Sequence, residues 1–187
     1  MSKGKLFVFS CASGVGKSTV LKRVMGARED LCFSVSATTR APREGEENGV
    51  HYFFVTVPEF KAMIDNGEML EYDYHNATYY GTPLGQLEEK MASKNVVLDI
   101  EPVGAFNVRK ALPEATLIFI MPPSVEELER RLRGRGDTSA DQIEMRLERA
   151  KWELEQRTKY DYVVVNDDVD RCANEILNII ANKAKDE

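Results

Sequence analysis

Short apolar runs alternate along the chain with segments of helical periodicity. The apolar runs lie at residues 5–9, 95–100, 116–121 and 162–165. Because they are nearly continuous, they predict strands whose two faces are both covered, as in a parallel sheet. Capping-box patterns, Ser-x-x-Glu at Ser124 and Ser-x-x-Gln at Ser139, predict helix starts between these strands, and a further helix is expected at 170–183. The alternation indicates an α/β fold with a central parallel sheet.

Residues 34–83 break this alternation. Polar and apolar positions alternate at 51–55, and further strand-like runs cover 69–74 and 78–80. A short helix is expected at 58–66, because a proline stands in its first turn and a glycine just past its end. We expect this β-rich stretch to form a substrate-binding subdomain attached to the α/β core.

The first apolar run leads into a glycine-rich loop that reads Gly-Val-Gly-Lys-Ser-Thr from Gly14 to Thr19. A strand, such a loop and then a helix form the context of a phosphate-binding P-loop, whose backbone N–H groups and helix N-terminus attract phosphate. Lys17 is expected to reach the β- and γ-phosphates, and the Ser18 hydroxyl to hold Mg²⁺. A chance glycine turn is the alternative, which the flanking strand and helix disfavour.

Cys11 departs from the P-loop pattern, because it stands where the first glycine of the motif is expected. A small side chain fits there if its backbone φ is negative. A thiol beside a helix N-terminus has a lowered pKa, so we expect alkylation of Cys11 to inactivate the protein and bound nucleotide to protect it.

Asp99 and Glu101 follow a buried strand, at the end of a parallel sheet where α/β folds bind ligands. Asp99 resembles the acidic residue that holds Mg²⁺ in P-loop enzymes. For both carboxylates the alternative is a solvated strand terminus.

Arginines cluster after the third apolar run. Arg131 and Arg146 flank residues 134–141, which contain Arg135 and have the pattern of a mobile lid. Arginines delivered by lid closure would stabilise a phosphoryl group in transfer. The alternative is a solvated face in which arginines pair with neighbouring glutamates, and this alternative suits Arg130, Arg133 and Arg149.

Length and composition narrow the class of protein. A chain of 187 residues suits one domain with small inserted subdomains, and its net charge of −6 argues against a general binder of nucleic acid or anionic membranes. We expect no membrane span, because every apolar run is shorter than about 20 residues, and no signal peptide. The three cysteines are widely spaced and fit no metal pattern, so we expect reduced thiols and a cytoplasmic location.

Beyond these signals, the chain resembles the guanylate kinases in unbroken order over residues 5–180. The most specific stretch is 34–55, with Ser-Val-Ser-Ala-Thr-Thr-Arg-Ala-Pro-Arg at its start. Further matching motifs lie at 70–72, 79–83, 98–101, 104, 122–124, 131–136 and 160–168.

This resemblance implies a single α/β domain of the P-loop NTPase type, with a three-layer core around a central parallel sheet. The core would comprise 1–33, 84–127 and 147–187, with a small β-rich GMP-binding subdomain at 34–83 and a helical lid at 128–146. The implied activity is phosphoryl transfer from ATP to GMP with Mg²⁺, giving ADP and GDP in purine nucleotide metabolism, with dGMP as a further acceptor.

The resemblance also implies roles for individual residues. The residues implied to bind ATP are Cys11, Ala12, Ser13, Gly14, Val15, Gly16, Lys17, Ser18, Thr19 and Asn166. Those implied to bind GMP are Ser36, Arg40, Arg43, Tyr52, Glu71, Tyr80, Thr82 and Glu101. The implied catalytic residues are Lys17, Arg40, Arg43, Asp99, Arg131, Arg135 and Arg146, and the Mg²⁺ ligands are Ser18 and Asp99.

Hydrogen-bond chemistry agrees with the implied base. Guanine presents N1–H and N2–H₂ donors side by side, and a carboxylate such as Glu71 can accept from both. The O6 of guanine needs a donor, which the Thr82 hydroxyl is expected to supply. Adenine reverses this pattern, and each buried group left unpaired would cost about 1–3 kcal/mol.

The chain departs from the guanylate kinase pattern at a few positions. Cys11 and Ala12 replace a usual Gly-Pro, Ala77 stands for a common glycine, and Val103 replaces a usual glutamine. None of these changes removes a charged catalytic group.

Three rival functions stay open: a peptide-binding scaffold domain, a kinase of similar fold for another phosphorylated acceptor such as a ribose bisphosphate, and a P-loop ATPase. Retention of Lys17 and the lid arginines disfavours the scaffold domain, and the set Ser36, Glu71 and Thr82 disfavours the other kinase. The oligomeric state stays undetermined.

Overall fold

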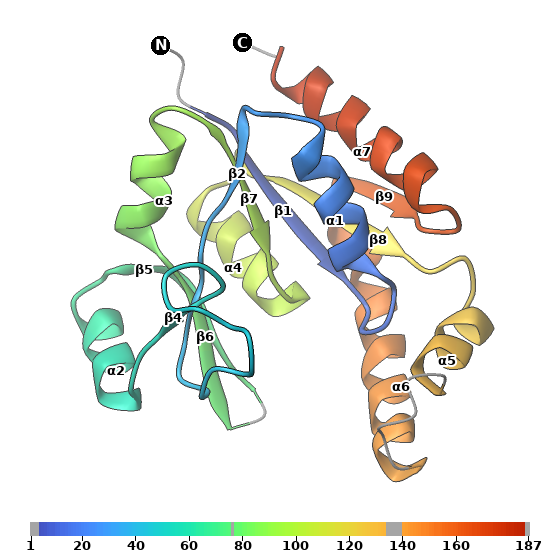
Figure 1. Ribbon diagram of the computed structural model, residues 1–187, viewed down its shortest axis with the longest axis horizontal. Helices are drawn as coiled ribbons and strands as arrows, with labels where there is room; N and C mark the ends of the chain where they lie inside the picture. The colour runs from blue at the N-terminus through green and yellow to red at the C-terminus, as the bar shows by residue number, and fades with distance from the viewer. Residues whose placement is uncertain (1–3, 76, 134–139, 186–187) are drawn as a thin grey trace. The chain divides into compact units, whose positions relative to one another are not determined.

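The computed structural model describes residues 4–75, 77–133 and 140–185 (Figure 1). The described residues form two compact units. The first unit takes its residues from 4–6, 30–98 and 103–115. The second unit takes its residues from 7–29, 99–102 and 116–185. The finer boundaries expected for a GMP-binding subdomain and a lid stay predictions.

A parallel sheet forms the centre of the second unit. Its strands are β1 (Leu6–Cys11), β8 (Thr116–Met121) and β9 (Tyr162–Val165). β1 pairs with β8, and β8 pairs with β9, both in parallel. The residues of β1 and β8 are buried except at each strand's last position, as their continuous apolar sequences predict. These strands confirm the apolar runs as parallel strands, although β1 ends two residues later than expected.

Helices accompany this sheet in the second unit. They are α1 (Lys17–Gly26), α5 (Val125–Arg133), α6 (Ala140–Glu155), the 3₁₀ helix η1 (Gln156–Lys159) and α7 (Val169–Lys183). α1 packs against α7 (Figure 1), and each turns a buried apolar stripe inward. Among the described residues, no helix combines the length and the apolar character that crossing a membrane requires.

The helix-start signals can be compared with these helices. α5 begins after Ser124, whose Oγ accepts a hydrogen bond of 3.1 Å from the N–H of Glu127. Asp168 caps α7 in the same way, since its Oδ1 accepts from the N–H of Arg171 at 2.8 Å. Ser139, the expected cap of α6, lies outside the described residues.

In the first unit, one pair of strands is parallel. β2 (Leu31–Phe33) pairs with β7 (Asn95–Asp99). Along the chain, helix α3 (Leu84–Met91) precedes β7 and helix α4 (Pro102–Ala111) follows it. β7 was expected from its apolar run. β2 was not, because its three residues are too few to show a periodicity.

The rest of the first unit is a four-stranded sheet in the order β4-β3-β6-β5. Its members are β3 (Ala37–Thr38), β4 (Phe53–Phe54), β5 (Met69–His75) and β6 (Thr78–Pro83), with α2 (Val57–Asp65) between β4 and β5. β5 and β6 form an antiparallel hairpin, and β3 pairs antiparallel with β6. This sheet confirms that the segment is rich in β-structure, although β4 is shorter than the strand expected at 51–55.

Ala77, which stands where the resemblance expects glycine, lies between β5 and β6 and has a φ of 59°. Of the described non-glycine residues, it is the one with a positive φ. Left-handed backbone crowds the Cβ atom of an L-residue, which explains why glycine suits this position.

Candidate active site

The glycine-rich loop between β1 and α1 has the backbone of a phosphate-binding loop. Gly14 and Gly16 have φ angles of 91° and 92°, in the left-handed region that glycine adopts without strain. A Cβ atom on Gly14 would also come within 2.9 Å of the Cδ2 atom of Leu132 in α5. Gly16 caps α1, so the helix begins at Lys17 and presents its N-terminus at the loop.

The carbonyl of Val15 is held by two side chains from other parts of the second unit. The Nδ2 of Asn166, a buried residue just after β9, donates to it at 2.8 Å, and the Nη1 of Arg131 donates at 3.0 Å. Arg131 is itself paired with Glu127 at 2.7 Å. Two donors therefore satisfy this carbonyl and fix the loop. The roles expected for Asn166 toward ATP and for Arg131 in catalysis stay predictions.

Lys17 and Asp99 form an ion pair at the start of α1 and the end of β7. Burial alone would lower the pKa of the Lys17 ammonium, but the Asp99 carboxylate more than offsets this effect and raises it. Lys17 is therefore a permanent cation. Ser18, the next residue of α1, is exposed.

The Cys11 thiol contradicts the expected low pKa. Burial raises its pKa to about 11, with nearby carboxylates, Asp99 foremost, adding to the shift and Lys17 opposing it. The thiol is therefore protonated at neutral pH. The expectation of a lowered pKa was wrong, because sequence does not show burial, and the effect of alkylation stays a prediction. The other cysteines, Cys32 and Cys172, are free thiols as expected.

The arginines near the expected lid divide into several groups. Arg130 and Arg133 pair with Glu127 and Glu129 on the surface of α5, which confirms the solvated-face interpretation for them. Arg149 does not fit that interpretation. It is half-buried in α6 and pairs with Glu101 and with Glu153. Of the two other arginines expected to act from the lid, Arg146 is exposed on α6, and Arg135 lies outside the described residues.

Glu101, expected to read guanine, belongs to the second unit, and its carboxylate pairs with Arg149. The other residues expected to read the base belong to the first unit. The guanine role of Glu101 stays a prediction.

A buried carboxylate lies in the β5–β6 hairpin of the first unit. Glu71 is 6% exposed and stands opposite Thr82, whose hydroxyl donates to its Oε1 at 2.7 Å. Burial raises the pKa of Glu71 to about 7, although the Thr82 hydrogen bond partly opposes the shift. A hydroxyl has one proton to donate, so Thr82 gives it to Glu71 in this arrangement, where the sequence led us to expect donation to the base.

Arg40 is the centre of a cluster of charged and aromatic side chains. Its two terminal nitrogens hold both oxygens of Glu46, at 2.6 and 2.7 Å. The guanidinium lies over the ring of Tyr52, 4.9 Å from the centroid, and the Tyr52 ring meets the Tyr80 ring edge-on at 6.1 Å. Three of the four residues expected to hold the GMP phosphate thus lie together. Arg43, the fourth, is exposed.

Sequence reasoning missed two residues that shape this region. Glu46, within the motif quoted for the resemblance, has a pKa of about 2 because it accepts from the Arg40 side chain and the Arg43 N–H. Gln86 in α3 accepts from the Val35 N–H at 2.8 Å and from the Ser34 hydroxyl at 3.2 Å, which fixes the backbone just before the half-buried Ser36. Neither contact leaves a local pattern in the sequence.

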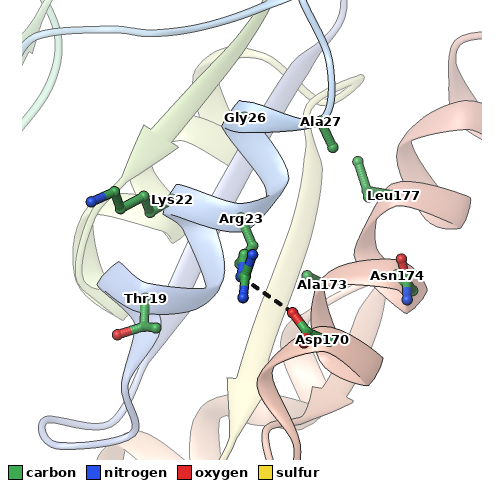
Figure 2. A pocket seen from close by; sticks show the side chains of 9 residues that line it. All are labelled: Thr19, Lys22, Arg23, Gly26, Ala27, Asp170, Ala173, Asn174 and Leu177. Atoms are coloured by element: carbon green, nitrogen blue, oxygen red, sulfur yellow. Dashed lines mark ion pairs between the residues drawn. The ribbon is translucent and has the colours of Figure 1, made fainter.

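A separate groove of about 680 Å³ lies between α1 and α7 (Figure 2). Thr19, expected to contact ATP, lies at its end nearest the start of α1. Farther along, Arg23 and Asp170 form an ion pair of 3.2 Å across it, and both side chains are well exposed. The remaining lining comes from Lys22, Gly26, Ala27, Ala173, Asn174 and Leu177.

Comparison with known proteins agrees with these features. The family model described as guanylate kinase matches residues 3–183. A guanylate kinase of Neisseria gonorrhoeae is 46% identical over 179 residues, which cover 95% of this chain and 87% of the relative. A guanylate kinase of Prochlorococcus marinus is 43% identical over 177 residues, covering 94% and 96%.

A solved structure is also similar. The crystal structure of guanylate kinase from Anaplasma phagocytophilum has a TM-score of 0.80 and 35% identity, and the match covers 100% of this chain and 89% of the other. Family model, relatives and solved structure agree over nearly the whole length. The chain therefore belongs to the guanylate kinase family.

Proposed function

We propose that this protein is an ATP:GMP phosphotransferase, which transfers the γ-phosphoryl group of ATP to the phosphate of GMP and yields ADP and GDP. Membership of the guanylate kinase family supports the reaction. The observation that carries the choice of base is the buried Glu71 carboxylate, held by Thr82 at 2.7 Å. Such a carboxylate can accept from both N1–H and N2–H₂ of guanine, whereas adenine offers no such pair of donors.

The acceptor phosphate would bind at the cluster around Arg40. The paired Glu46 fixes the plane of the guanidinium, and Tyr52 supports it by a cation–π contact. The phenol of Tyr80 and the exposed Arg43 would complete the phosphate contacts. GMP is thus held at its base by Glu71 and at its phosphate by Arg40.

ATP would bind at the loop between β1 and α1. The N–H groups at the start of α1 would face its β- and γ-phosphates, and Lys17 would neutralise charge there. The family implies Mg²⁺, and the residues fit it, because the exposed Ser18 hydroxyl and the Asp99 carboxylate are the oxygen ligands that this ion prefers. Bound Mg²⁺ neutralises phosphate charge.

The protein's own task is mainly electrostatic. The acceptor is already an anionic phosphate oxygen, so the reaction needs little proton transfer. Two unit charges at about 4 Å repel by roughly 4 kcal/mol at an effective dielectric constant of 20. Lys17, Arg40, Arg43 and the lid arginines would offset this repulsion, and lid closure would keep water from the γ-phosphate.

A panel of acceptors tests the proposal. ADP release from ATP is measured with GMP, dGMP, AMP, CMP, UMP or a ribose bisphosphate as acceptor. We expect turnover with GMP and dGMP that exceeds turnover with the other acceptors by at least about a hundredfold, since two unpaired buried groups cost about 3 kcal/mol together. Preference for a ribose bisphosphate, equal ADP release without acceptor, or inactivity would each overturn it in favour of one of the three rivals.

We further propose that the protein works in the cytoplasm. Its three cysteines are free thiols, which suits a reducing compartment. Its net charge of −6 suits small-molecule substrates better than nucleic acid.

A further inference from the structure

Glu153 is a buried carboxylate for which the proposed reaction has no use. It lies in α6 and is 3% exposed. Its neighbours Ala150 and Leu154 on the same helix are buried too. An apolar side chain would fill this place without the cost of burying a charge, so the carboxylate must gain its stability from its partners.

Each oxygen of Glu153 has a donor. Oε2 accepts from the backbone N–H of Ser13 in the glycine-rich loop at 3.2 Å, and Oε1 accepts from the Nε of Arg149 at 3.1 Å. Arg149 in turn pairs with Glu101, just after the strand that ends at Asp99. Burial raises the pKa of Glu153, and the Ser13 and Arg149 hydrogen bonds oppose the shift.

This contact complements the one described at Val15. Asn166 and Arg131 hold the carbonyl of Val15, and Glu153 holds the N–H of Ser13. Gly14, with its left-handed backbone, lies between these two anchored residues. Glycine has more backbone freedom than any other residue type, and Gly14 is therefore held in place by hydrogen bonds to the residues before and after it.

We propose that Glu153 is a positioning residue, which holds the loop in its ATP-binding shape through the N–H of Ser13. The inference rests on the proposed binding of ATP by this loop. Arg149 orients Glu153, so α6, the loop and Glu101 form one hydrogen-bonded network. Loss of Glu153 releases the loop on one side of Gly14 and raises the cost of ordering it around a triphosphate.

The test uses Glu153→Ala and Glu153→Gln, with Glu148→Ala, an exposed carboxylate of the same helix, as the matched control. The KM values for ATP and for GMP and the melting temperature are measured for each purified protein. We expect Glu153→Ala to raise the KM for ATP about tenfold, the worth of one hydrogen bond to a charged group, with the KM for GMP changed less than about twofold. The control should match the wild type.

Glu153→Gln preserves size and keeps the test open if the alanine variant does not fold. A glutamine offers one acceptor oxygen to two donors, so it too should raise the KM for ATP selectively. A lower melting temperature with an unchanged ratio of the two KM values would show a merely structural role and overturn the inference. Inactivity of the wild type toward GMP would instead overturn the proposed function.

Discussion

The hydroxyl of Thr82 donates a 2.7 Å hydrogen bond to the carboxylate of Glu71, its cross-strand neighbour in the β5–β6 hairpin. Glu71 is buried, and burial raises its pKa to about 7. A carboxyl group that titrates near neutral pH can lose its acceptor character within the physiological range. Recognition of guanine in this protein should therefore depend on pH.

We predict that the KM for GMP rises as the pH falls. With a pKa of about 7, the ionised fraction of Glu71 is about tenfold smaller near pH 6 than near pH 8. Only the ionised form accepts from both guanine donors, so the KM for GMP should rise by a similar factor while the KM for ATP changes less. The glutamine of Glu71→Gln does not titrate. This variant should have a high KM for GMP at every pH, and its KM should vary with pH only through the titration of the nucleotide itself. Parallel pH profiles for the two proteins would refute this role of Glu71.

Replacement of Glu46 should raise the KM for GMP and leave the KM for ATP unchanged. Glu46 holds Arg40 through both terminal nitrogens, and its loss frees a guanidinium that must then be ordered by the substrate. We expect Glu46→Ala to raise the KM for GMP about five- to tenfold. Glu44→Ala, an exposed carboxylate of the same loop, is the control. Equal kinetics for the two variants would show that Arg40 needs no partner.

Ala77→Gly should stabilise the protein. Ala77 has a φ of 59°, and relief of this strain is worth about 1 kcal/mol. For a chain of this size that corresponds to a rise of about 2–4 °C in melting temperature, measurable by calorimetry. Thr78→Gly, a substitution at the next position within β6, should lower the melting temperature instead. A lower melting temperature for Ala77→Gly would mean that the alanine stabilises the turn by more than its backbone strain costs.

Native Cys11 should resist alkylation. A rise in pKa from 9.0 to about 11 reduces the thiolate fraction at neutral pH about a hundredfold. Peptide mass spectrometry after a timed iodoacetamide pulse should show slow modification of Cys11 in the folded protein and fast modification in urea. Rapid alkylation of the folded protein, with loss of activity, would restore the reactive thiolate expected from the motif alone.

The sequence predicted those parts of the fold that leave a periodic pattern. Strands β8 and β9 match their apolar runs residue for residue. β8 is buried on both faces, as a continuous apolar run predicts, whereas Val163 and Val165 of β9 are exposed. β2, with three residues, left no pattern. Thr56 and Glu59 form a capping box that was not used to place the expected helix. With this cap, α2 begins at Val57, one residue before the start expected at residue 58.

The site was predictable where residue type alone decides the chemistry, as for Gly14, Gly16 and Lys17 in the loop. The site was not predictable where the role of a residue depends on a hydrogen-bond partner that is distant in the sequence. Glu153 lies 140 residues from Ser13, and Gln86 lies 51 from Val35. Burial is equally hidden in a sequence, which is why the pKa of Cys11 was expected to shift in the wrong direction.

The central claim is transfer of a phosphoryl group between two nucleotides, and its most direct measurement is the stoichiometry of products. ATP, GMP and Mg²⁺ are mixed with the protein, and all nucleotides are quantified by chromatography over time. We predict GDP and ADP in equal amounts with the wild type, and nearly none with Lys17→Ala, which lacks the cation of the loop. ADP formed without GDP, or turnover that persists in Lys17→Ala, would contradict the account.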